Sequence, residues 1–240
     1  MIVVGLDLES TGLDKMKDRT IEVCSILWTT NFNRSIGSRT LLVQSDGVSI
    51  PSEVTELTGI TQAMADRFGV TQDEAFEEME YFISQAEAVV AFNGRRFDVP
   101  FSQQWAKRLN KAFPDKPLID PFTDLPMRGQ ELITMCAKKG IYYAAHEAGA
   151  DTAAMLQLMS KFPFDTVWAR SQSPIVAVRS MQHRSENKKA KKHKFRWNPD
   201  LKIWWKAVKE IDLSVLQTQV NGEFGLEVLD TPVEDLESED

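Results

Sequence analysis

Two carboxylates follow an apolar run at the start of the chain, in the segment IVVGLDLESTGLD at residues 2–14. Asp7 and Glu9 are two residues apart, so on a strand their side chains point to the same face. Two like charges this close resist joint ionisation unless a cation lies between them. Carboxylate oxygens suit a hard divalent ion, Mg²⁺ or Mn²⁺. A solvated strand end would also explain the pair, and the D-x-E motif alone does not decide between the two.

A third acid follows a second apolar run, in the segment VVAFNGRRFDVPF at residues 89–101. The strand predicted over residues 88–93 ends at Asn93, and Asp98 falls in the first turn of the next helix. From this position its carboxylate can turn back toward the end of strand 88–93, which we expect beside the first strand. A helix-start acid that is stabilised by the helix dipole is the alternative explanation.

The segment HEAGADTAAM at residues 146–155 contains a histidine and a fourth acid. His146 and Asp151 would point about 140° apart on one continuous helix. They can share a site only if His146 lies on the loop before the helix and Asp151 lies in its first turns. Gly149 between them would ease the bend. A structural role for His146 stays open, because a lone histidine is often structural.

The segments DLESTGL, AFNGRRFDVPF and HEAGADTAAM resemble, in order and spacing, the three exonuclease motifs of the DEDDh superfamily. This superfamily includes the proofreading epsilon subunits of bacterial replicases and the ribonuclease T-like enzymes. The resemblance covers residues 1 to about 162. The chain departs from the usual pattern at Ser10, where threonine is commoner, and at Gly149-Ala150, where a larger residue is usual. Neither departure falls on a ligand position.

The resemblance implies a metal-dependent 3′–5′ exonuclease that releases nucleoside 5′-monophosphates from the 3′ end of DNA, with RNA also open as a substrate. We expect single strands to be preferred. It implies two divalent ions, Mg²⁺ or Mn²⁺, which can activate a water and stabilise the departing 3′-oxygen. The general base would be His146, because imidazoles exchange protons near neutral pH. The implied metal ligands are Asp7, Glu9, Asp98 and Asp151.

The resemblance also implies a binding site for the terminal nucleotide. In the family, backbone groups of the segment that matches Thr11, Gly12 and Leu13 contact the sugar, and the leucine contacts a base. Asn93 matches a position that helps to shape the site. A non-catalytic nucleic-acid binder or replication accessory protein on the same fold is the alternative function, which the intact set of acids and histidine disfavours.

The elements that must position these residues follow from the apolar pattern. Three strand-like segments with short connections predict an antiparallel meander over residues 2–8, 20–29 and 38–44. Thr71 and Glu74 form a capping-box pattern at the start of a helix over residues 71–86. A strand at 88–93, a helix at 97–112, a strand at 117–120 and helices at 129–139 and 148–161 follow. Together they predict an α/β, ribonuclease H-like domain over residues 1–165, with a mixed five-stranded sheet flanked by helices.

The composition changes after residue 165, and we expect a small α+β appendage over residues 172–226. It contains a predicted strand at 171–181, a basic helix at 185–193 and a hairpin at 195–208 that turns at Asn198-Pro199-Asp200. Ten Lys or Arg and two acids between residues 184 and 209 give a local charge of +8, within a chain of net charge −7. The segment 227–240 is acidic and poor in apolar residues, which predicts a disordered tail.

The basic residues of the appendage alternate with Trp197, Trp204 and Trp205. Aromatic and basic side chains together can stack bases and hold phosphates. A docking site for a replication or repair protein partner, or a purely structural core, are the alternatives. Trp204 and Trp205 are adjacent on a predicted strand, so they should face opposite sides.

The remaining features of the sequence concern its location. No run of apolar residues is long enough for a membrane span, and no secretory signal pattern precedes the first strand. The two cysteines lie far apart without a metal-binding spacing. These features predict a cytoplasmic protein with no membrane partner.

Overall fold

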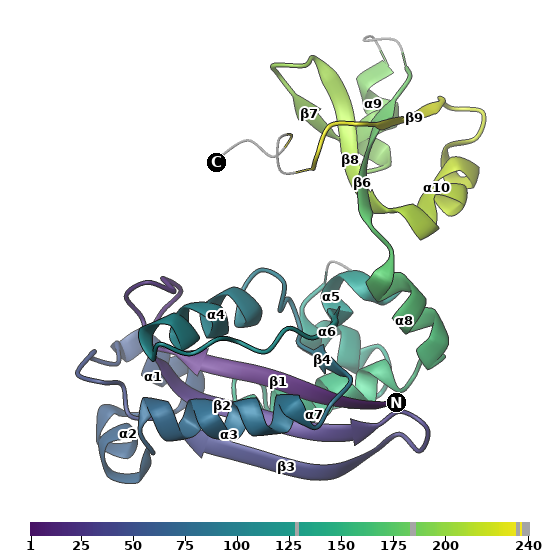
Figure 1. The fold of residues 1–240 in the computed structure, drawn as a ribbon. Helices are drawn as coiled ribbons and strands as arrows, with labels where there is room; N and C mark the ends of the chain where they lie inside the picture. Colours follow the sequence, from purple (N-terminus) through teal and green to yellow (C-terminus); the bar gives the residue numbers. More distant parts are fainter. Residues whose placement is uncertain (128–129, 183–185, 234–235, 237–240) are drawn as a thin grey trace. The chain divides into compact units, whose positions relative to one another are not determined.

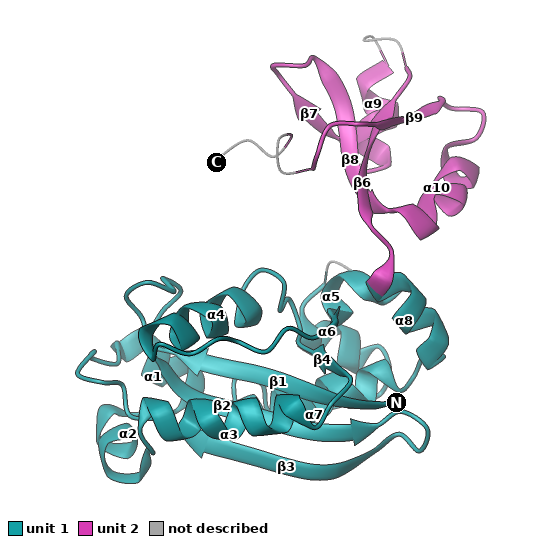
Figure 2. Ribbon diagram, viewed as in Figure 1, with its two compact units in different colours: residues 1–171 teal, residues 172–240 magenta. Residues whose placement is uncertain are grey.

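The computed structural model describes residues 1–127, 130–182, 186–233 and 236 (Figure 1). The chain divides into two compact units, Met1–Ser171 and Gln172–Asp240 (Figure 2). The first unit extends beyond the predicted boundary at residue 165, because a further helix, α8 (Phe164–Gln172), buries Val167 in the core. None of the helices in the described residues has the length and apolar character that crossing a bilayer would require.

A mixed five-stranded sheet forms the centre of unit 1, as the sequence predicted (Figure 1). The strands β1 (Ile2–Ser10), β2 (Thr20–Thr29) and β3 (Arg34–Leu42) form an antiparallel meander. The strands β4 (Ala88–Val90) and β5 (Leu118–Ile119) continue the sheet in parallel with β1, in the order β3-β2-β1-β4-β5. The third strand begins four residues earlier than predicted, because Arg34, Ser35 and Gly37 also pair with β2.

Helices cover both faces of this sheet. On one face, α3 (Gln72–Ser84) and α4 (Asp98–Arg108) pack with Phe76, Met79 and Trp105 against Val4 and Leu6 of β1. On the other face, α6 (Leu132–Ala137), α7 (Ala148–Met159) and α8 surround Val3 of β1. Residues of β1 therefore alternate between two apolar layers, so that both faces of the strand are buried. The predicted capping box starts α3, with reciprocal hydrogen bonds between Thr71 and Glu74.

Three short helices of unit 1 carry no strong apolar period and were not predicted. The helix predicted over 129–139 begins later, at Leu132, and residue 129 lies outside the described residues. These three helices are α1 (Ser52–Thr58), α2 (Gln62–Phe68) and α5 (Pro121–Asp124), and α8 was not predicted either.

Unit 2 is a four-stranded antiparallel sheet with helices packed on one face. The sheet order is β7-β8-β6-β9, and Val178 and Val208 contact α9 and α10 through one apolar core. Trp205 lies on the opposite face, against Leu236. The elements are β6 (Ile175–Ser180), α9 (Asn187–Lys192), β7 (Arg196–Asn198), β8 (Ile203–Lys209), the 3-10 helix η2 (Glu210–Asp212), α10 (Leu213–Val220) and β9 (Leu226–Leu229).

Two predictions for this region need correction. The disordered tail predicted over 227–240 is wrong for its first residues, because residues 226–229 pair with β6 as strand β9. Residues 234–235 and 237–240 of that tail lie outside the described residues. The basic helix predicted over 185–193 is shorter in the structure, where α9 covers Asn187–Lys192. Residue 185 lies outside the described residues. The hairpin of β7 and β8 pairs as predicted.

Candidate active site

A cavity of about 560 Å³ lies where the C-terminal ends of β1 and β4 meet α4 and α7. Phe92, Phe97 and Phe122 supply apolar walls, and Asn93 adds an amide. Four of the five predicted catalytic residues line the same cavity, namely Asp7, Asp98, His146 and Asp151.

Strand β1 positions the first two acids. Asp7 lies opposite Cys24 of β2 and Glu9 lies opposite Glu22, so the two acids share one face of β1 as predicted. Burial raises the pKa of Asp7 well above its usual range, and the carboxylates of Asp98 and Asp151 raise it further. Burial, followed by the charges of Asp151 and Glu22, raises the pKa of Glu9 to about 7. The repulsion anticipated from the D-x-E spacing contributes less, because Glu9 raises the pKa of Asp7 by a smaller amount than Asp98 and Asp151 do.

The third acid, Asp98, is the first residue of α4 and is only 3% exposed. A hydrogen bond from the backbone of Leu8 ties its carboxylate to β1, which agrees with the predicted turn back toward the sheet. Burial raises the pKa of Asp98 to about 7, even though this hydrogen bond favours the charged form. A buried carboxyl group is therefore held beside Asp7 by the strand itself.

The loop between β4 and α4 is fixed by a second pair of buried acids. Asp120 accepts hydrogen bonds from the backbone N–H groups of Asn93 and Arg95, at 2.8 and 3.3 Å. Asp124 in turn accepts from Asp120 N and from the Arg95 guanidinium, at 2.8 and 3.1 Å. Asn93 has a positive φ of 56°, a conformation that asparagine tolerates better than most residues. These bonds hold Asn93 at the cavity wall and Asp98 at the start of α4.

The loop before α7 positions His146 and Asp151 as the sequence predicted. Asp151 lies in the first turn of α7, and its Oδ2 accepts a 2.9 Å hydrogen bond from His146 N. The bend between them occurs at His146 itself, which has a φ of +67°, and the assignment of this bend to Gly149 was wrong. Gly149 lies inside the helix, where a Cβ would stand 3.1 Å from Thr40 Oγ1, so this glycine allows close packing against β3.

Two further residues belong to the site and were missed from the sequence. Glu22 of β2 is 8% exposed, faces Glu9 across the sheet and accepts a 2.8 Å hydrogen bond from Ala148 N. A hydrogen bond from the Tyr143 side chain reaches Asp151, and burial with this contact holds the pKa of Tyr143 well above its usual range. An acid inside the apolar run TIEVCSILWT was the available signal for Glu22.

The donor set fits divalent cations. One side-chain ligand atom each from Glu9, His146 and Asp151 lies within 4.8 Å of the other two. The carboxylates of Asp7 and Asp98 add to the negative charge beside this group. Because these acids raise one another's pKa, a bound cation would relieve the repulsion, and carboxylate oxygens are the donors that Mg²⁺ and Mn²⁺ prefer.

The predicted nucleotide-binding segment begins where β1 ends. Thr11 is buried, and its N–H and hydroxyl group bond to Arg19 O and Asp18 Oδ1 at 2.9 and 2.8 Å. A Cβ on Gly12 would stand 2.5 Å from Asp18 Oδ2, so a larger residue here would displace the carboxylate that bonds to Thr11 and Asp14. Leu13 is 85% exposed. Asn93 lines the cavity described above, whereas Thr11, Gly12 and Leu13 are not among its lining residues.

Comparison with known proteins places this geometry in a family. The RNase T exonuclease model matches residues 4–159. The PolC-type DNA polymerase III of Mycoplasma pneumoniae is 30% identical over 167 residues, and that of Mycoplasma genitalium is 28% identical over 171. Each match covers 66% of this chain and 11% of the polymerase, so the chain spans only about a tenth of these relatives.

Solved structures share the fold. Exonuclease I of E. coli, in a complex with a dA16 oligonucleotide, is 14% identical with a TM-score of 0.62, covering 95% of this chain and 62% of that one. The nuclease domain of 3′hExo, a DEDDh family member bound to rAMP, is 16% identical with a TM-score of 0.57, covering 68% of this chain and 92% of that one. The exonuclease resemblance seen in the three motifs is thereby confirmed, and this chain belongs to the RNase T family of exonucleases.

Proposed function

We propose that this protein is a metal-dependent 3′–5′ exonuclease that releases nucleoside 5′-monophosphates. The observation that carries the proposal is the convergence of Asp7, Asp98, His146 and Asp151 from three separate segments on one cavity. Glu9 joins them because one of its carboxylate oxygens lies within 4.8 Å of ligand atoms of His146 and Asp151. Family membership supports nuclease chemistry, and the direction and products are part of the proposal.

The four carboxylates would hold two divalent ions, Mg²⁺ or Mn²⁺. When bound, such ions polarise the scissile phosphate and stabilise charge on the attacking and leaving oxygens. The protein contributes fixed geometry: β1 holds Asp7 and Glu9 on one face, and the hydrogen bond from Leu8 holds Asp98 beside them. The ligand group therefore needs little rearrangement when metal binds.

His146 would accept the proton of the attacking water. Its side chain is exposed at the cavity, and its backbone is fixed by Asp151 and by the left-handed turn before α7. An exposed imidazole can pass the proton on to solvent after each turnover. The terminal nucleotide would rest against the apolar walls near Asn93, with the exposed Leu13 side chain available for contact with a base.

The substrate would be a nucleic acid with a free 3′ end, preferably single-stranded. DNA is the first candidate, because the relatives include DNA polymerases and an exonuclease bound to dA16. RNA is also a candidate, because the 3′hExo nuclease domain is bound to rAMP. The polymerase relatives favour a role in replication or repair. The cytoplasmic location and the protein partner that would dock on unit 2 stay predictions.

A labelling experiment tests the proposal directly. The purified full chain is incubated with Mg²⁺ or Mn²⁺ and with 5′-labelled or 3′-labelled single and double strands of DNA and RNA. We expect a 5′-labelled strand to shorten stepwise, a 3′-label to appear at once as mononucleotide, and EDTA to stop both. Mononucleotides released from the 5′ end, or internal cleavage, would contradict the proposal. Binding without hydrolysis would favour the non-catalytic alternative.

A further inference from the structure

Unit 2 contains a groove of its own that the proposed active site does not use. It has a volume of about 600 Å³ and lies between helix α9 and the β7–β8 hairpin. Its described lining consists of Asn187, Lys191, Trp197, Pro199, Lys202 and Trp204.

Two tryptophans form one wall of this groove. Trp197 and Trp204 are paired across the hairpin, so both face the same side of the sheet, and their ring centroids lie 5.6 Å apart. Trp204 Nε1 donates a 3.1 Å hydrogen bond to Asn187 Oδ1, which fixes this ring against α9. Trp197 packs on the fixed ring and is 41% exposed. The neighbouring Trp205 faces the other side and is buried, as the sequence predicted.

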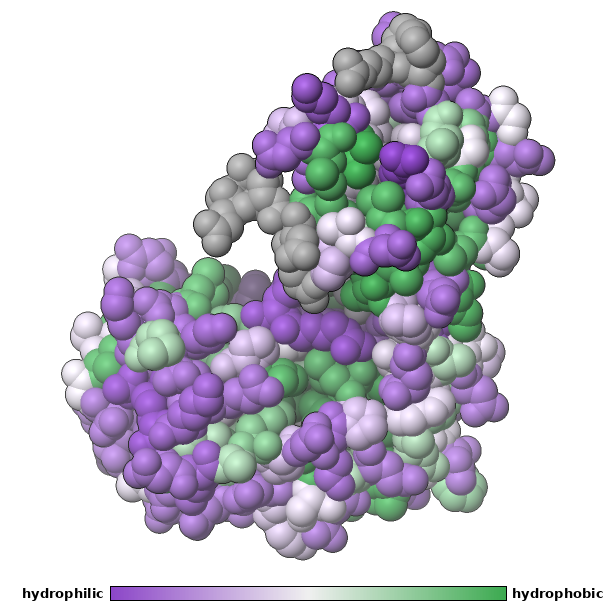
Figure 3. Space-filling view, turned by 45° about the horizontal axis from the view of Figure 1, so that its top comes forward, coloured by the Kyte–Doolittle hydropathy of each residue, from purple (hydrophilic) through white to green (hydrophobic). Residues whose placement is uncertain are grey.

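The exposure of Trp197 needs an explanation. Unit 2 shows hydrophobic residues at its surface among hydrophilic ones (Figure 3). An exposed apolar patch that lines a groove often marks a binding site, whereas a single exposed aliphatic side chain needs no explanation. Trp197 meets this condition because it lies in the groove, on a neighbour that is already held in place.

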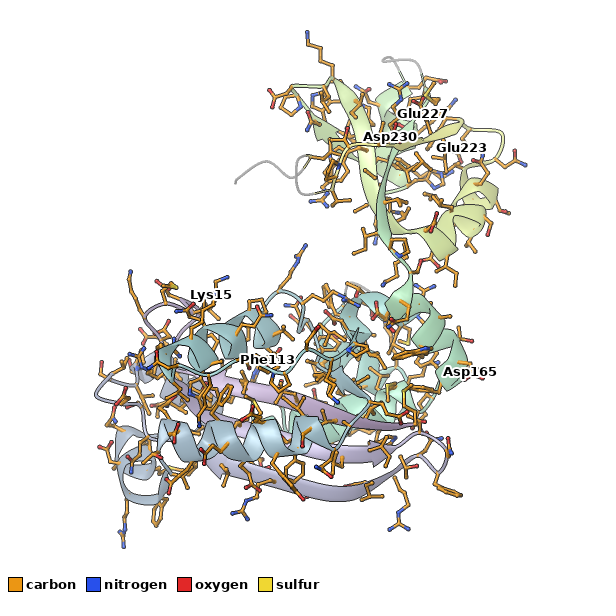
Figure 4. All side chains as sticks on the ribbon, in the orientation of Figure 1. Lys15, Phe113, Asp165, Glu223, Glu227 and Asp230 are labelled. Carbon is orange, nitrogen blue, oxygen red and sulfur yellow. The ribbon has the colours of Figure 1, made fainter. Side chains whose placement is uncertain are left out.

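The charge around the groove favours an anionic occupant. Lys191 and Lys202 are exposed, and Lys191 Nζ lies 5.7 Å from the Trp204 ring centroid. None of the six lining residues is acidic. Of the acids labelled in Figure 4, Glu227 lies on β9, at the opposite edge of the sheet from β7, where it pairs with Arg179. No acidic side chain in the described lining of the groove therefore offsets the positive charge of Lys191 and Lys202.

We propose that this groove binds single-stranded nucleic acid, with an unpaired base stacked on Trp197 and phosphates held by Lys191 and Lys202. An aromatic platform flanked by cations matches both parts of a nucleotide, because every base offers a π-face and every linkage offers a negative charge. The inference rests on the proposed nuclease function for the identity of the ligand. It adds a nucleic-acid contact on unit 2, remote in sequence from the catalytic residues.

Binding measurements on the full chain test this inference. Fluorescence anisotropy with a labelled dT20 or rU20 strand, in EDTA to prevent hydrolysis, gives the affinity at several salt concentrations. We expect Trp197→Ala to weaken binding about 5- to 150-fold, the usual effect of losing one stacking platform. Each lysine that contacts a phosphate contributes about 0.7 to the slope of log K against log salt on single strands. Changing both Lys191 and Lys202 to Gln should therefore flatten that slope by about 1.4.

Matched controls separate these effects from general damage. Leu201→Ala removes an exposed apolar side chain of the same hairpin turn, and Lys188→Gln removes a charge from the same helix, outside the groove lining. Both should bind like the wild type. Thermal unfolding shows whether Trp197→Ala folds, and the lysine variants keep the inference testable if it does not.

Three results would overturn the inference. The first is a salt slope for the lysine variant equal to that of Lys188→Gln. The second is unchanged affinity in a folded Trp197→Ala protein. The third is that Trp197→Ala loses binding of a labelled peptide of Asp, Glu and Leu but binds the oligonucleotide as the wild type does. That result would assign the groove to a protein partner. These binding measurements need no hydrolysis, so they are independent of the nuclease assay. An inactive wild type would contradict only the proposed exonuclease activity. An active wild type whose groove variants bind with unchanged affinity would contradict only the proposed role of the groove.

Discussion

Glu22 Oε2 accepts a 2.8 Å hydrogen bond from the backbone N–H of Ala148, the first residue of α7. This bond joins the central sheet to the helix that carries Asp151. We expect Glu22→Ala to lower catalytic activity about 10- to 100-fold, the usual cost of losing a residue that orients metal ligands. Glu22→Gln keeps an acceptor oxygen and should recover most of the loss. Metal affinity, measured by calorimetry, should fall in parallel with activity for a positioning residue. Equal activity in all three proteins would contradict this role.

The carboxylate of Asp7 lies at the centre of the proposed metal site. Asp7→Asn should abolish detectable hydrolysis, because a ligand and its charge are lost, while the fold stays intact. The metal-free variant should unfold at a temperature equal to or higher than the wild type, because one source of repulsion has gone. Circular dichroism and a nuclease assay with and without EDTA make the comparison. Activity that survives both the substitution and EDTA would rule out metal-dependent catalysis.

His146 is assigned a proton-transfer role that can be separated from metal binding. His146→Ala should lower the single-turnover rate about 10²- to 10⁴-fold, the range for loss of a general base, with metal affinity nearly unchanged. Because a nitrogen of this imidazole lies within 4.8 Å of ligand atoms of Glu9 and Asp151, loss of metal affinity would instead assign His146 as a ligand.

The raised carboxyl pKa values predict how the metal-free protein responds to pH. Folding raises the pKa of Glu9 from 4.5 and that of Asp98 from 3.8, each to about 7. Between these limits the folded state binds more protons than the unfolded state, so the free energy of unfolding falls as pH rises. The melting temperature in EDTA should therefore decrease from pH 5 to pH 7.5, and Glu9→Gln should weaken this decrease. Saturating Mg²⁺ should remove most of it, and a melting temperature that rises over this interval would contradict the linkage.

The sequence predicted the sheet and the placement of the acids because each follows from local pattern. The apolar runs at residues 2–8 and 20–29 predict two neighbouring strands, and Asp98 and Asp151 each fall in the first turn of a helix. Glu22 could not be found in this way, because its role depends on the cross-strand register that sets it opposite Glu9. The short helices α1, α2 and α5 were missed because each has at most two buried residues to set a period, and in α1 none is buried.

The assignment of the bend before α7 illustrates a second limit. Gly149 was expected to supply the bend, but it is His146 that adopts a positive φ. Gly149 instead leaves room for Thr40, which packs closely against this part of the helix. Which of two nearby residues takes a positive φ depends on the partner of each backbone group. Here that partner is the Asp151 side chain, which holds His146 N from five residues away.

The positive φ of His146 has a cost for the whole molecule. A non-glycine residue in this conformation is disfavoured by an amount of order 1 kcal/mol or more, which the surrounding hydrogen bonds must offset. Glycine at this position would relax the backbone and also remove the imidazole. Selection for thermal stability alone would therefore favour a glycine here and a protein without the imidazole. At the turn before α7, stability and catalytic activity are thus opposed.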